Sequence, residues 1–312
     1  MFTAHRYTSA RRAAWDSYVK QSKNGTFLFL RGYMDYHSDR FADFSTLLTD
    51  EGGTTVALFP ANRVGSQLTS HGGLSYGGMI CDSSMTTTKA LDVFSAWIAY
   101  CKQEGILEIK YKAIPSIYHR GPSDEDLYAL FIHGASLYRR DVLSVLDLRQ
   151  VPTLQERRRR AIKKAIGNGI EVHESDDFPV FWTILERNLI SRHHTKPVHT
   201  VSEIKRLRDQ FPENIQLFCA FESGNMCAGA LLYHAAPAIH AQYVASSEAG
   251  RATGALDLLF ATLIEKFRAE AHFFDFGSSN EEEGRFLNRG LADFKEGFGA
   301  RAICHDFYRL LC

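Results

Sequence analysis

The sequence predicts an α/β protein with mixed sheets, built from two domains. The chain has 312 residues, which exceeds one ordinary hydrophobic core and suits two domains of about 150 residues each. Helical and strand-like patterns alternate along most of its length. A strongly basic helical stretch, residues 152–169, interrupts this alternation, and three strand-like segments follow soon after it. We therefore place the boundary there, with domains at 1–150 and 151–312.

The first domain is expected to mix helices with short strands. Amphipathic patterns predict two helices, at 10–20 and 87–104, and Gly105 ends the second. Apolar or alternating stretches predict the strands 54–59, 67–70, 107–112 and 143–148. Residues 70–78 hold four glycines, which predicts an irregular loop or a bulged strand.

The second domain is expected to carry a three-stranded antiparallel meander among its helices. Helical patterns cover 152–169, 178–191, 201–210 and 255–270. Strand patterns cover 215–222, 226–233, 239–246, 273–277 and 301–310. Short turns join the first three of these strands, which favours antiparallel pairing.

Composition excludes several classes of protein. Basic and acidic residues number 36 each, so no overall charge attracts nucleic acid or membranes. The first 20 residues lack the apolar core of a signal peptide, and no apolar run reaches the roughly 18 residues of a membrane span. Six cysteines without a CxxC pair are typical of a reducing compartment. We expect a cytoplasmic protein with no membrane span.

One turn has the pattern of an anion site. A strand ends at Tyr243-Val-Ala-Ser-Ser247, and Gly250-Arg-Ala-Thr-Gly-Ala255 leads into a helix. The N-terminus of a helix offers unpaired N–H groups and a partial positive charge, which suit a phosphate. A plain strand-to-helix turn explains the same residues equally well.

Ordered motifs in both halves carry a family resemblance. The second half contains Tyr243-Val-Ala-Ser-Ser, Arg251-x-x-Gly254-Ala255, Phe274-Asp-Phe-Gly277-Ser278 and Phe294-Lys-x-x-Phe298-Gly299-Ala300. Earlier come Ser75-Tyr-Gly-Gly78, Lys163-Lys-x-x-x-Asn-Gly-Ile170 and Arg192-His-x-x-Lys196-Pro197. Together they make most of the chain resemble the FemABX-like branch of the GNAT acyltransferase superfamily.

The resemblance implies an enzyme with two tandem GNAT-like domains packed around a cleft. It implies transfer of an acyl group to an amine, with the donor site in the second domain. Acyl-CoA is the expected co-substrate, and aminoacyl-tRNA is the alternative donor. The implied acceptor is a small-molecule amine, an amino sugar or a cell-envelope precursor such as those of polysaccharide biosynthesis. A non-catalytic binding protein on the same fold is a further alternative.

The donor site is expected around the turn that precedes the helix at 255–270. Its residues are Ala245, Ser246, Ser247, Arg251, Thr253, Gly254 and Ala255. Members that bind acyl-CoA read Gln/Arg-x-x-Gly-x-Gly/Ala, whereas the last position here is Leu256. A bulky side chain there would crowd a pyrophosphate, so the sequence leaves the donor open.

Three residues are candidates for catalysis. Lys295 stands in the Phe-Lys-x-x-Phe-Gly motif and would bind a phosphate or stabilise the tetrahedral intermediate; a solvated lysine is the alternative. Tyr243 and Asp275 are candidate proton carriers, against buried structural roles. The chain lacks a Gly-x-Ser-x-Gly elbow and a Ser-His-Asp order, which disfavours a hydrolase. Direct attack in a ternary complex is therefore preferred.

The acceptor is expected to contact polar residues from both halves: His71, Tyr76, Arg192, His193, Lys196 and Ser278. His193, His194 and His199 have no cysteine or carboxylate companion, so we expect a polar loop and no metal.

The basic run 157–164 suits either a solvated helix face or the backbone of tRNA, the one nucleic acid kept open. Zero net charge and the lack of a long coiled-coil insertion favour acyl-CoA over tRNA. The oligomeric state is left as monomer or homodimer.

Overall fold

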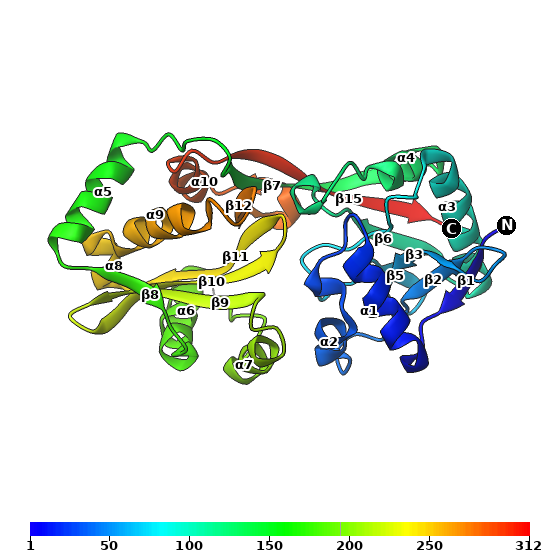
Figure 1. The fold of residues 1–312 in the computed structure, drawn as a ribbon, viewed down its shortest axis with the longest axis horizontal. Coiled ribbons are helices and arrows are strands. Elements are labelled where there is room, and N and C mark those ends of the chain that lie inside the picture. The colour runs from blue at the N-terminus through cyan, green and yellow to red at the C-terminus, as the bar shows by residue number, and fades with distance from the viewer. Residues whose placement is uncertain (194) are drawn as a thin grey trace. The chain divides into compact units, whose positions relative to one another are not determined.

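A computed structural model describes the backbone of residues 1–193 and 195–312, and all their side chains except those of Arg192 and His193. Contacts divide the chain into two units (Figure 1). Unit 1 comprises Met1–Asp141, Asn280–Phe286 and Cys304–Cys312, and unit 2 comprises Val142–Ser279 and Leu287–Ile303. The division thus falls at Asp141, before the boundary expected at residue 150, and the last residues of the chain belong to unit 1.

Unit 1 combines short strands with helices of different lengths. Strands β1, β2 and β3 pair antiparallel in order, and β4 pairs with β5 in the same sense. Strand β5 runs parallel to β6, whose other edge pairs antiparallel with the end of β15, Phe307–Leu311. The elements are β1 (Thr3–Arg6), α1 (Arg12–Gln21), α2 (Arg31–Met34), β2 (Thr46–Thr49), β3 (Thr55–Phe59), β4 (Asn62–Val64), β5 (Gln67–Thr69), α3 (Thr87–Gln103), β6 (Glu108–Lys112) and α4 (Glu125–Ile132).

Helix α3 shows how the local sequence builds the core of unit 1. The Thr86 side chain caps the helix by accepting from the Lys89 backbone N–H, and Gly105 follows the end with φ +74°. Apolar residues recur along one face and are buried, among them Trp97, whose ring stacks on Phe59 at 4.0 Å. The predicted helix at 87–104 is confirmed.

Unit 2 is a mixed sheet with helices on both faces. Its strand order is β7-β12-β11-β10-β9-β8, and the predicted antiparallel meander of β9, β10 and β11 is confirmed. The elements are β7 (Ser136–Asp147, which begins in unit 1), α5 (Glu156–Gly167), β8 (Glu171–Glu174), α6 (Phe178–His193), α7 (Val201–Gln210), β9 (Ile215–Glu222), β10 (Asn225–Ala235), β11 (Ala238–Ser246), α8 (Glu248–Thr253), α9 (Ala255–Phe267), β12 (Phe273–Ser278), α10 (Arg289–Glu296) and β15 (Arg301–Leu311). The two-residue strands β13 (Asn280–Glu281) and β14 (Phe286–Leu287) lie between β12 and α10.

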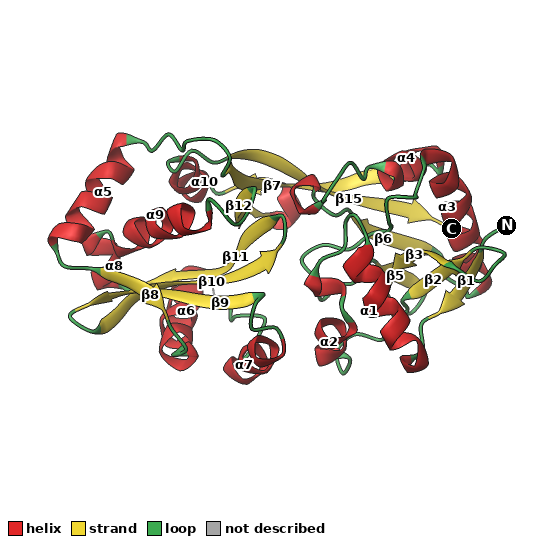
Figure 2. Cartoon of the chain, viewed as in Figure 1, coloured by secondary structure: helices red, strands yellow, loops and turns green. Residues whose placement is uncertain are grey.

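The helices of unit 2 cover its sheet from both sides. Figures 1 and 2 show α9 and α5 on one side of the meander and α6 on the other, in agreement with the contacts between these elements. Helix α9 is apolar because its face packs on the sheet and α5 packs on it in turn. This arrangement confirms the predicted α/β class with mixed sheets.

Strands β11 and β12 separate after a short parallel pairing. They are paired from Ala238–Phe273 to His240–Asp275, and β11 then continues to Ser246. Its opposite edge remains paired with β10 along this stretch. Beyond His240, the β12-side edge of β11 is therefore open to a ligand.

The structure adds elements that sequence patterns did not predict. Helix α8 occupies the turn expected to lead directly from β11 into α9, and Ser247 caps it through the Gly250 N–H. Six residues are too few to show an apolar period, so such a helix is easily missed. None of the helices in the described part of the chain has the length and apolar character needed to cross a bilayer.

Candidate active site

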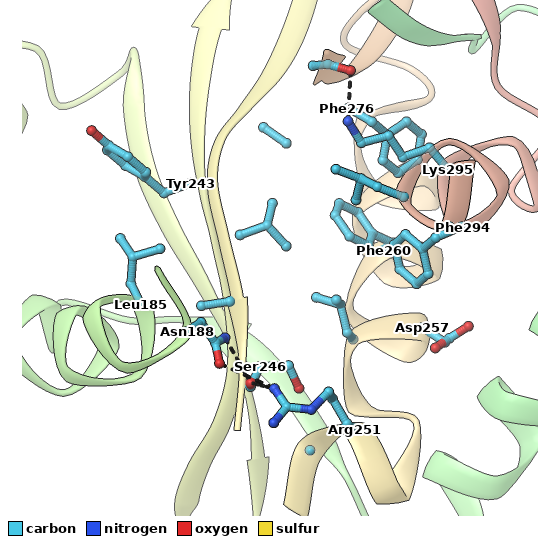
Figure 3. A pocket seen from close by; sticks show the side chains of 18 of the residues that line it. Leu185, Asn188, Tyr243, Ser246, Arg251, Asp257, Phe260, Phe276, Phe294 and Lys295 are labelled. Carbon is cyan, nitrogen blue, oxygen red and sulfur yellow. Dashed lines mark hydrogen bonds between the residues drawn. The ribbon is translucent and has the colours of Figure 1, made fainter. Parts of the chain in front are cut away.

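A cavity of about 880 Å³ lies in unit 2 where β11 and β12 separate (Figure 3). The open stretch of β11, residues 240–246, forms one wall, and Phe276–Ser278 of β12 lie opposite. Side chains of α6, α9 and α10 complete the lining. The separation of two strands thus brings an unpaired backbone edge into a cavity.

The cavity extends along both faces of β11. In Figure 3, Tyr243 and Leu185 lie on one side of the strand, and Phe260 and Phe294 lie on the other. The Phe260 ring contacts those of Phe276 and Phe294, with centroids 4.9 and 5.9 Å apart. The wall beside α9 is therefore largely aromatic and suits an apolar group.

Lys295 is buried at the edge of this aromatic wall. Its Nζ donates to the carbonyl oxygens of Gly277 at 2.9 Å and Ser278 at 2.8 Å, and its side chain lines the cavity. Burial lowers the pKa of Lys295 to about 8, although the nearby Asp275 carboxylate raises it. The structure rules out the solvated lysine that the sequence left as an alternative, because only 5% of the residue is exposed.

Tyr243 lines the cavity from β11 and contacts a buried histidine. Its hydroxyl lies 2.7 Å from Nδ1 of His199, and its ring meets Trp182 edge to face. Burial raises the pKa of Tyr243. These contacts hold Tyr243 in one position, and its role as a proton carrier stays a prediction.

Asp275 lies behind the lining, with 1% of its surface exposed. One carboxylate oxygen accepts from the Gly277 N–H at 2.7 Å, and the other lies 2.8 Å from Nδ1 of His240. His240 itself lines the cavity. Asp275 thus reaches the cavity through His240, a residue that the sequence analysis did not select.

Arg251 folds back onto the end of β11. Its Nη1 donates to the Ser246 carbonyl at 2.7 Å and to Oδ1 of Asn188 at 3.2 Å, as Figure 3 shows. The Asn188 amide donates to the same carbonyl at 2.9 Å. The cavity lining includes Arg251, Ser246 and Ala245. The Arg251 guanidinium thus binds the last carbonyl of β11 at this end of the cavity.

The predicted donor turn uses several of its own backbone N–H groups. Those of Gly250, Arg251 and Gly254 donate to the Ser247 side chain, the Ser247 carbonyl and the Gly250 carbonyl, respectively. Gly254 has φ +82°, and a Cβ there would lie 2.6 Å from the Ala161 carbonyl oxygen. The glycine permits a left-handed backbone and a close approach of α5.

An ion pair lies at the start of α9. Asp257 accepts from Arg158 Nη1 at 2.5 Å, and both side chains line the cavity beside Leu256. Burial raises the pKa of Asp257, and the Arg158 guanidinium opposes that shift. The first turn of α9 therefore presents a neutral pair and an apolar side chain at the position expected for a phosphate.

Other predicted donor and acceptor residues have different positions. Ser278 lines the cavity, and its role toward the acceptor stays a prediction. Ala255 is fully buried in the core, Thr253 donates to the Ala249 carbonyl, and Lys196 is exposed. None of the last three is among the described residues that line the cavity.

Part of the predicted acceptor loop, namely His194 and the side chains of Arg192 and His193, lies outside the described residues. In the described part of the chain, no three His, Cys, Asp or Glu side chains are grouped as for a metal ion.

His71 and Tyr76 belong to the interior of unit 1. His71 is 3% exposed with φ +54°, and burial, with the nearby His37, Lys112 and Arg31, lowers its pKa well below its usual range. The Tyr76 hydroxyl donates to Thr26 Oγ1 at 3.1 Å. Both residues pack inside unit 1, and their role toward an acceptor stays a prediction.

The structure adds His240, Asn188 and Arg158 to the predicted site. Arg158 was assigned to a basic run, but its side chain turns inward to Asp257, unlike the exposed neighbours on α5. His240 and Asp275 are 35 residues apart in the chain and become neighbours through the register of two parallel strands. Strand register is what a single sequence does not reveal.

A comparison with protein families gives a match across much of unit 2. Residues 154–296 match the family described as "Acetyltransferase (GNAT) domain". The match includes the open edge of β11, the turn at α8 and Lys295. No curated protein matches the sequence.

Solved structures resemble the chain along nearly its whole length. FemX has a TM-score of 0.69 at 13% identity, covering 99% of this chain and 97% of its own. L-PGS from Bacillus licheniformis has a TM-score of 0.62 at 13% identity, with coverage of 98% and 93%. A tandem GNAT protein from the clavulanic acid biosynthesis pathway gives 0.56 at 11% identity, with coverage of 100% and 98%. At these identities the likeness concerns the fold.

Proposed function

We propose that this chain, whose residues 154–296 match the GNAT acetyltransferase domain and whose fold resembles that of FemX, is an acyltransferase that transfers an acyl group to an amine in its unit 2 cavity. The open edge of β11 facing Lys295 is the observation that carries the proposal. An unpaired strand offers N–H and C=O groups that orient an extended acyl donor. The cavity is large enough, at about 880 Å³, for a substrate of that class.

The reaction needs no covalent intermediate. The acceptor nitrogen attacks the carbonyl carbon of the donor, a C–N bond forms, and the C–O or C–S bond to the leaving group breaks. One proton leaves the amine and one is delivered to the departing oxygen or sulfur. The protein must hold both reactants in line and stabilise the negative charge on the carbonyl oxygen.

Lys295 is suited to the role of stabilising that charge. Its ammonium has three N–H donors, and carbonyl oxygens of Gly277 and Ser278 accept two of them. The third donor remains for a ligand in the cavity. A buried cation acts more strongly on a developing oxyanion than an exposed one, since little water screens it.

The donor turn weighs against acyl-CoA, the donor expected from the sequence. A pyrophosphate at this turn would need free backbone N–H groups, yet those of Gly250, Arg251 and Gly254 already donate within the turn. It would also meet Leu256 and the Asp257 carboxylate, which Arg158 neutralises. These contacts favour the alternative donor, an aminoacyl-tRNA, as the first candidate to test.

Helix α5 supports a donor with a nucleic acid backbone. Its basic residues other than Arg158 are exposed: Arg157, Arg159, Arg160, Lys163 and Lys164. The helix packs on α9, and its Arg158 side chain enters the cavity lining. Closely spaced cations on this helix would bind successive phosphates and release their counterions.

The aromatic wall supports an apolar or aromatic acyl group. Phe260, Phe276 and Phe294 surround the side of the cavity next to α9. A charged acyl side chain would lose hydration there without gaining a partner among these rings. For the acceptor we keep the class that the resemblance implies, an amine of an amino sugar or a cell-envelope precursor.

The first experiment compares donors directly. Thermal unfolding is followed with phenylalanyl-tRNA, uncharged tRNA, acetyl-CoA, palmitoyl-CoA and free CoA. A ligand at 100 times its Kd adds about 2.7 kcal/mol of stability, which gives a clear shift. Transfer of the labelled acyl group to glucosamine is then measured with each donor that binds.

The outcomes separate the donor classes. We expect phenylalanyl-tRNA to bind and to donate, and uncharged tRNA to bind more weakly. If only an acyl-CoA raised the unfolding temperature, the donor would be a thioester and the tRNA proposal would be excluded. Binding without transfer to any amine would support the non-catalytic alternative.

A further inference from the structure

We propose that His240 is the proton-transferring base of the cavity and that Asp275 positions its ring. The inference rests on the proposed acyl transfer to an amine and assigns the proton path that this reaction needs. His240 lines the cavity at the last paired residue of β11, where the open edge begins. It therefore lies beside the backbone edge that would hold the donor.

The contacts of Asp275 fix the tautomer of His240. Both carboxylate oxygens are engaged, Oδ1 by the Gly277 N–H at 2.7 Å and Oδ2 by His240 Nδ1 at 2.8 Å. The positive Lys295 nearby favours the ionised carboxylate, and an ionised carboxylate can only accept. Nδ1 thus carries the hydrogen and donates it, which leaves Nε2 as an acceptor.

The opposite side of the ring is available to a ligand. The His240 side chain is 18% exposed, while Asp275 is buried. No described residue bonds to Nε2, and Cε1 lies 3.4 Å from the Cβ position of Gly277, which has φ +75°. A Cβ at residue 277 would make only an ordinary van der Waals contact with the ring, so the positive φ is what favours glycine there.

The proton path follows from this geometry. As the acceptor nitrogen bonds to the donor carbonyl, its proton moves to Nε2, and the resulting imidazolium is stabilised by Asp275. When the intermediate collapses, Nε2 returns the proton to the leaving oxygen or sulfur. His240 ends neutral, and Lys295 keeps its own protons throughout. General base catalysis of this kind contributes about 10²–10⁴-fold to a rate.

The charged groups around the ring agree with the assignment. Asp275 comes from β12, and Lys295 comes from α10 with its Nζ on the carbonyls of Gly277 and Ser278. The charge of Lys295 lies near the charge of Asp275, and His240 Nδ1 contacts the same carboxylate. The three residues form an ordered group at one end of the cavity.

The test compares two acceptors in the His240→Gln variant of the full chain. Glucosamine must lose a proton during attack on phenylalanyl-tRNA, whereas hydroxylamine is a reactive nucleophile that needs little help from a base. We expect His240→Gln to lower kcat with glucosamine by about 10²-fold or more, leaving KM for the donor little changed. With hydroxylamine the loss should be less than tenfold. Asp275→Asn should show the same pattern with a smaller loss.

The matched control is His272→Gln, which replaces an exposed histidine next to β12 and keeps its backbone bond to Pro237. It should match the wild type with both acceptors. Equal losses with both acceptors in His240→Gln would overturn the assignment, because a structural role lowers both rates. Wild-type protein that transfers to neither acceptor would instead overturn the proposed function.

An independent measurement needs no turnover. Nitrogen-15 NMR of the wild type should show His240 as the neutral Nδ1–H tautomer, and Asp275→Asn should mix the tautomers. A neutral Nε2–H tautomer in the wild type would overturn the proposal whatever the activity, because Nε2 would then have no lone pair for the amine proton.

Discussion

The Cα of Gly254 packs against the backbone of Ala161, so that an added Cβ would lie 2.6 Å from the Ala161 carbonyl oxygen. This contact joins the turn after α8 to helix α5, and φ +82° at Gly254 makes the turn itself left-handed. Gly254, which the sequence analysis proposed as a donor-binding residue, thus allows the close packing of this turn against α5.

Replacing Gly254 by alanine should destabilise the fold by about 2–4 kcal/mol, from left-handed strain of about 1–2 kcal/mol plus the clash with Ala161. Urea unfolding measures the loss. Gly224→Ala is the matched control, since Gly224 has φ +80° and nothing within 4 Å of its Cβ position. Equal losses in the two variants would show that the contact with Ala161 costs nothing.

Lys295 should make activity and stability respond to pH in opposite directions. Its pKa is about 8 in the folded protein against 10.5 in a model compound, so between these values the unfolded chain binds more protons. The contribution of this group to stability therefore rises with pH across that window. The transfer rate should fall across the same window if the cation stabilises the oxyanion. Rate and urea unfolding are followed from pH 7 to 10.

Lys295→Met is the comparison for both measurements. It should lower kcat by about 10²–10³-fold, as removal of one oxyanion donor does, and flatten the rise in stability above pH 8. A rate in the wild type that stays constant to pH 10 would contradict a cationic role.

The Arg158–Asp257 pair should show coupling in a double-mutant cycle. Arg158→Met leaves Asp257 without its cation, and we expect a loss of about 2 kcal/mol at pH 7. Adding Asp257→Leu should recover most of this lost stability, because the buried carboxylate without a cation is then removed.

The sign of its pH dependence follows from the raised pKa of Asp257. The folded state binds this proton more readily than the unfolded state, so the group destabilises the fold as pH rises above its unfolded pKa. The loss in Arg158→Met should therefore be smaller at pH 4 than at pH 7. Additive losses at pH 7 would mean that the pair does not interact.

The exposed cations of α5 should control binding of charged tRNA. Replacing Arg160, Lys163 and Lys164 by glutamine should weaken binding and make the plot of log K against log salt less steep by about 2. Filter binding at several salt concentrations measures the slope. The control variant replaces Arg11, Lys20 and Lys102, which are exposed in unit 1, and should leave the slope unchanged. A slope that does not change in the α5 variant would exclude this helix from the tRNA contact.

Much of the fold follows from local sequence patterns. The helix α7 and the strand β9 begin and end at the residues predicted from the sequence, 201–210 and 215–222, and the structure adds a Thr200–Glu203 capping box at the start of α7. β7 is longer than predicted, because its first half reads as polar. There Arg140 forms a two-point ion pair with Asp306 of β15, at 2.6 and 2.7 Å. Partners so distant in the chain are invisible to a local pattern.

The candidate site was predictable only in part. Lys295 and Arg251 came from motif order, and both line the cavity. The family match confirms a GNAT domain over residues 154–296, and that domain supports the acyltransferase class. His240 was missed because nothing beside it in the sequence indicates Asp275. Whether acyl-CoA is the donor stays a prediction. The sequence could not show that backbone N–H groups of the turn at α8 are already hydrogen-bonded, because this depends on atomic geometry.

The route of the chain also constrains how the protein is made. Residues Cys304–Leu311 of β15 follow all of unit 2 in the sequence, yet they belong to unit 1, where Phe307–Leu311 pair with β6. A nascent chain can therefore form the meander of unit 2 while the edge of β6 that pairs with β15 is still unpaired. Unit 1, although synthesised first, is completed last, so a ribosome that stalls before β15 would leave the exposed strand as a target for chaperones and proteases.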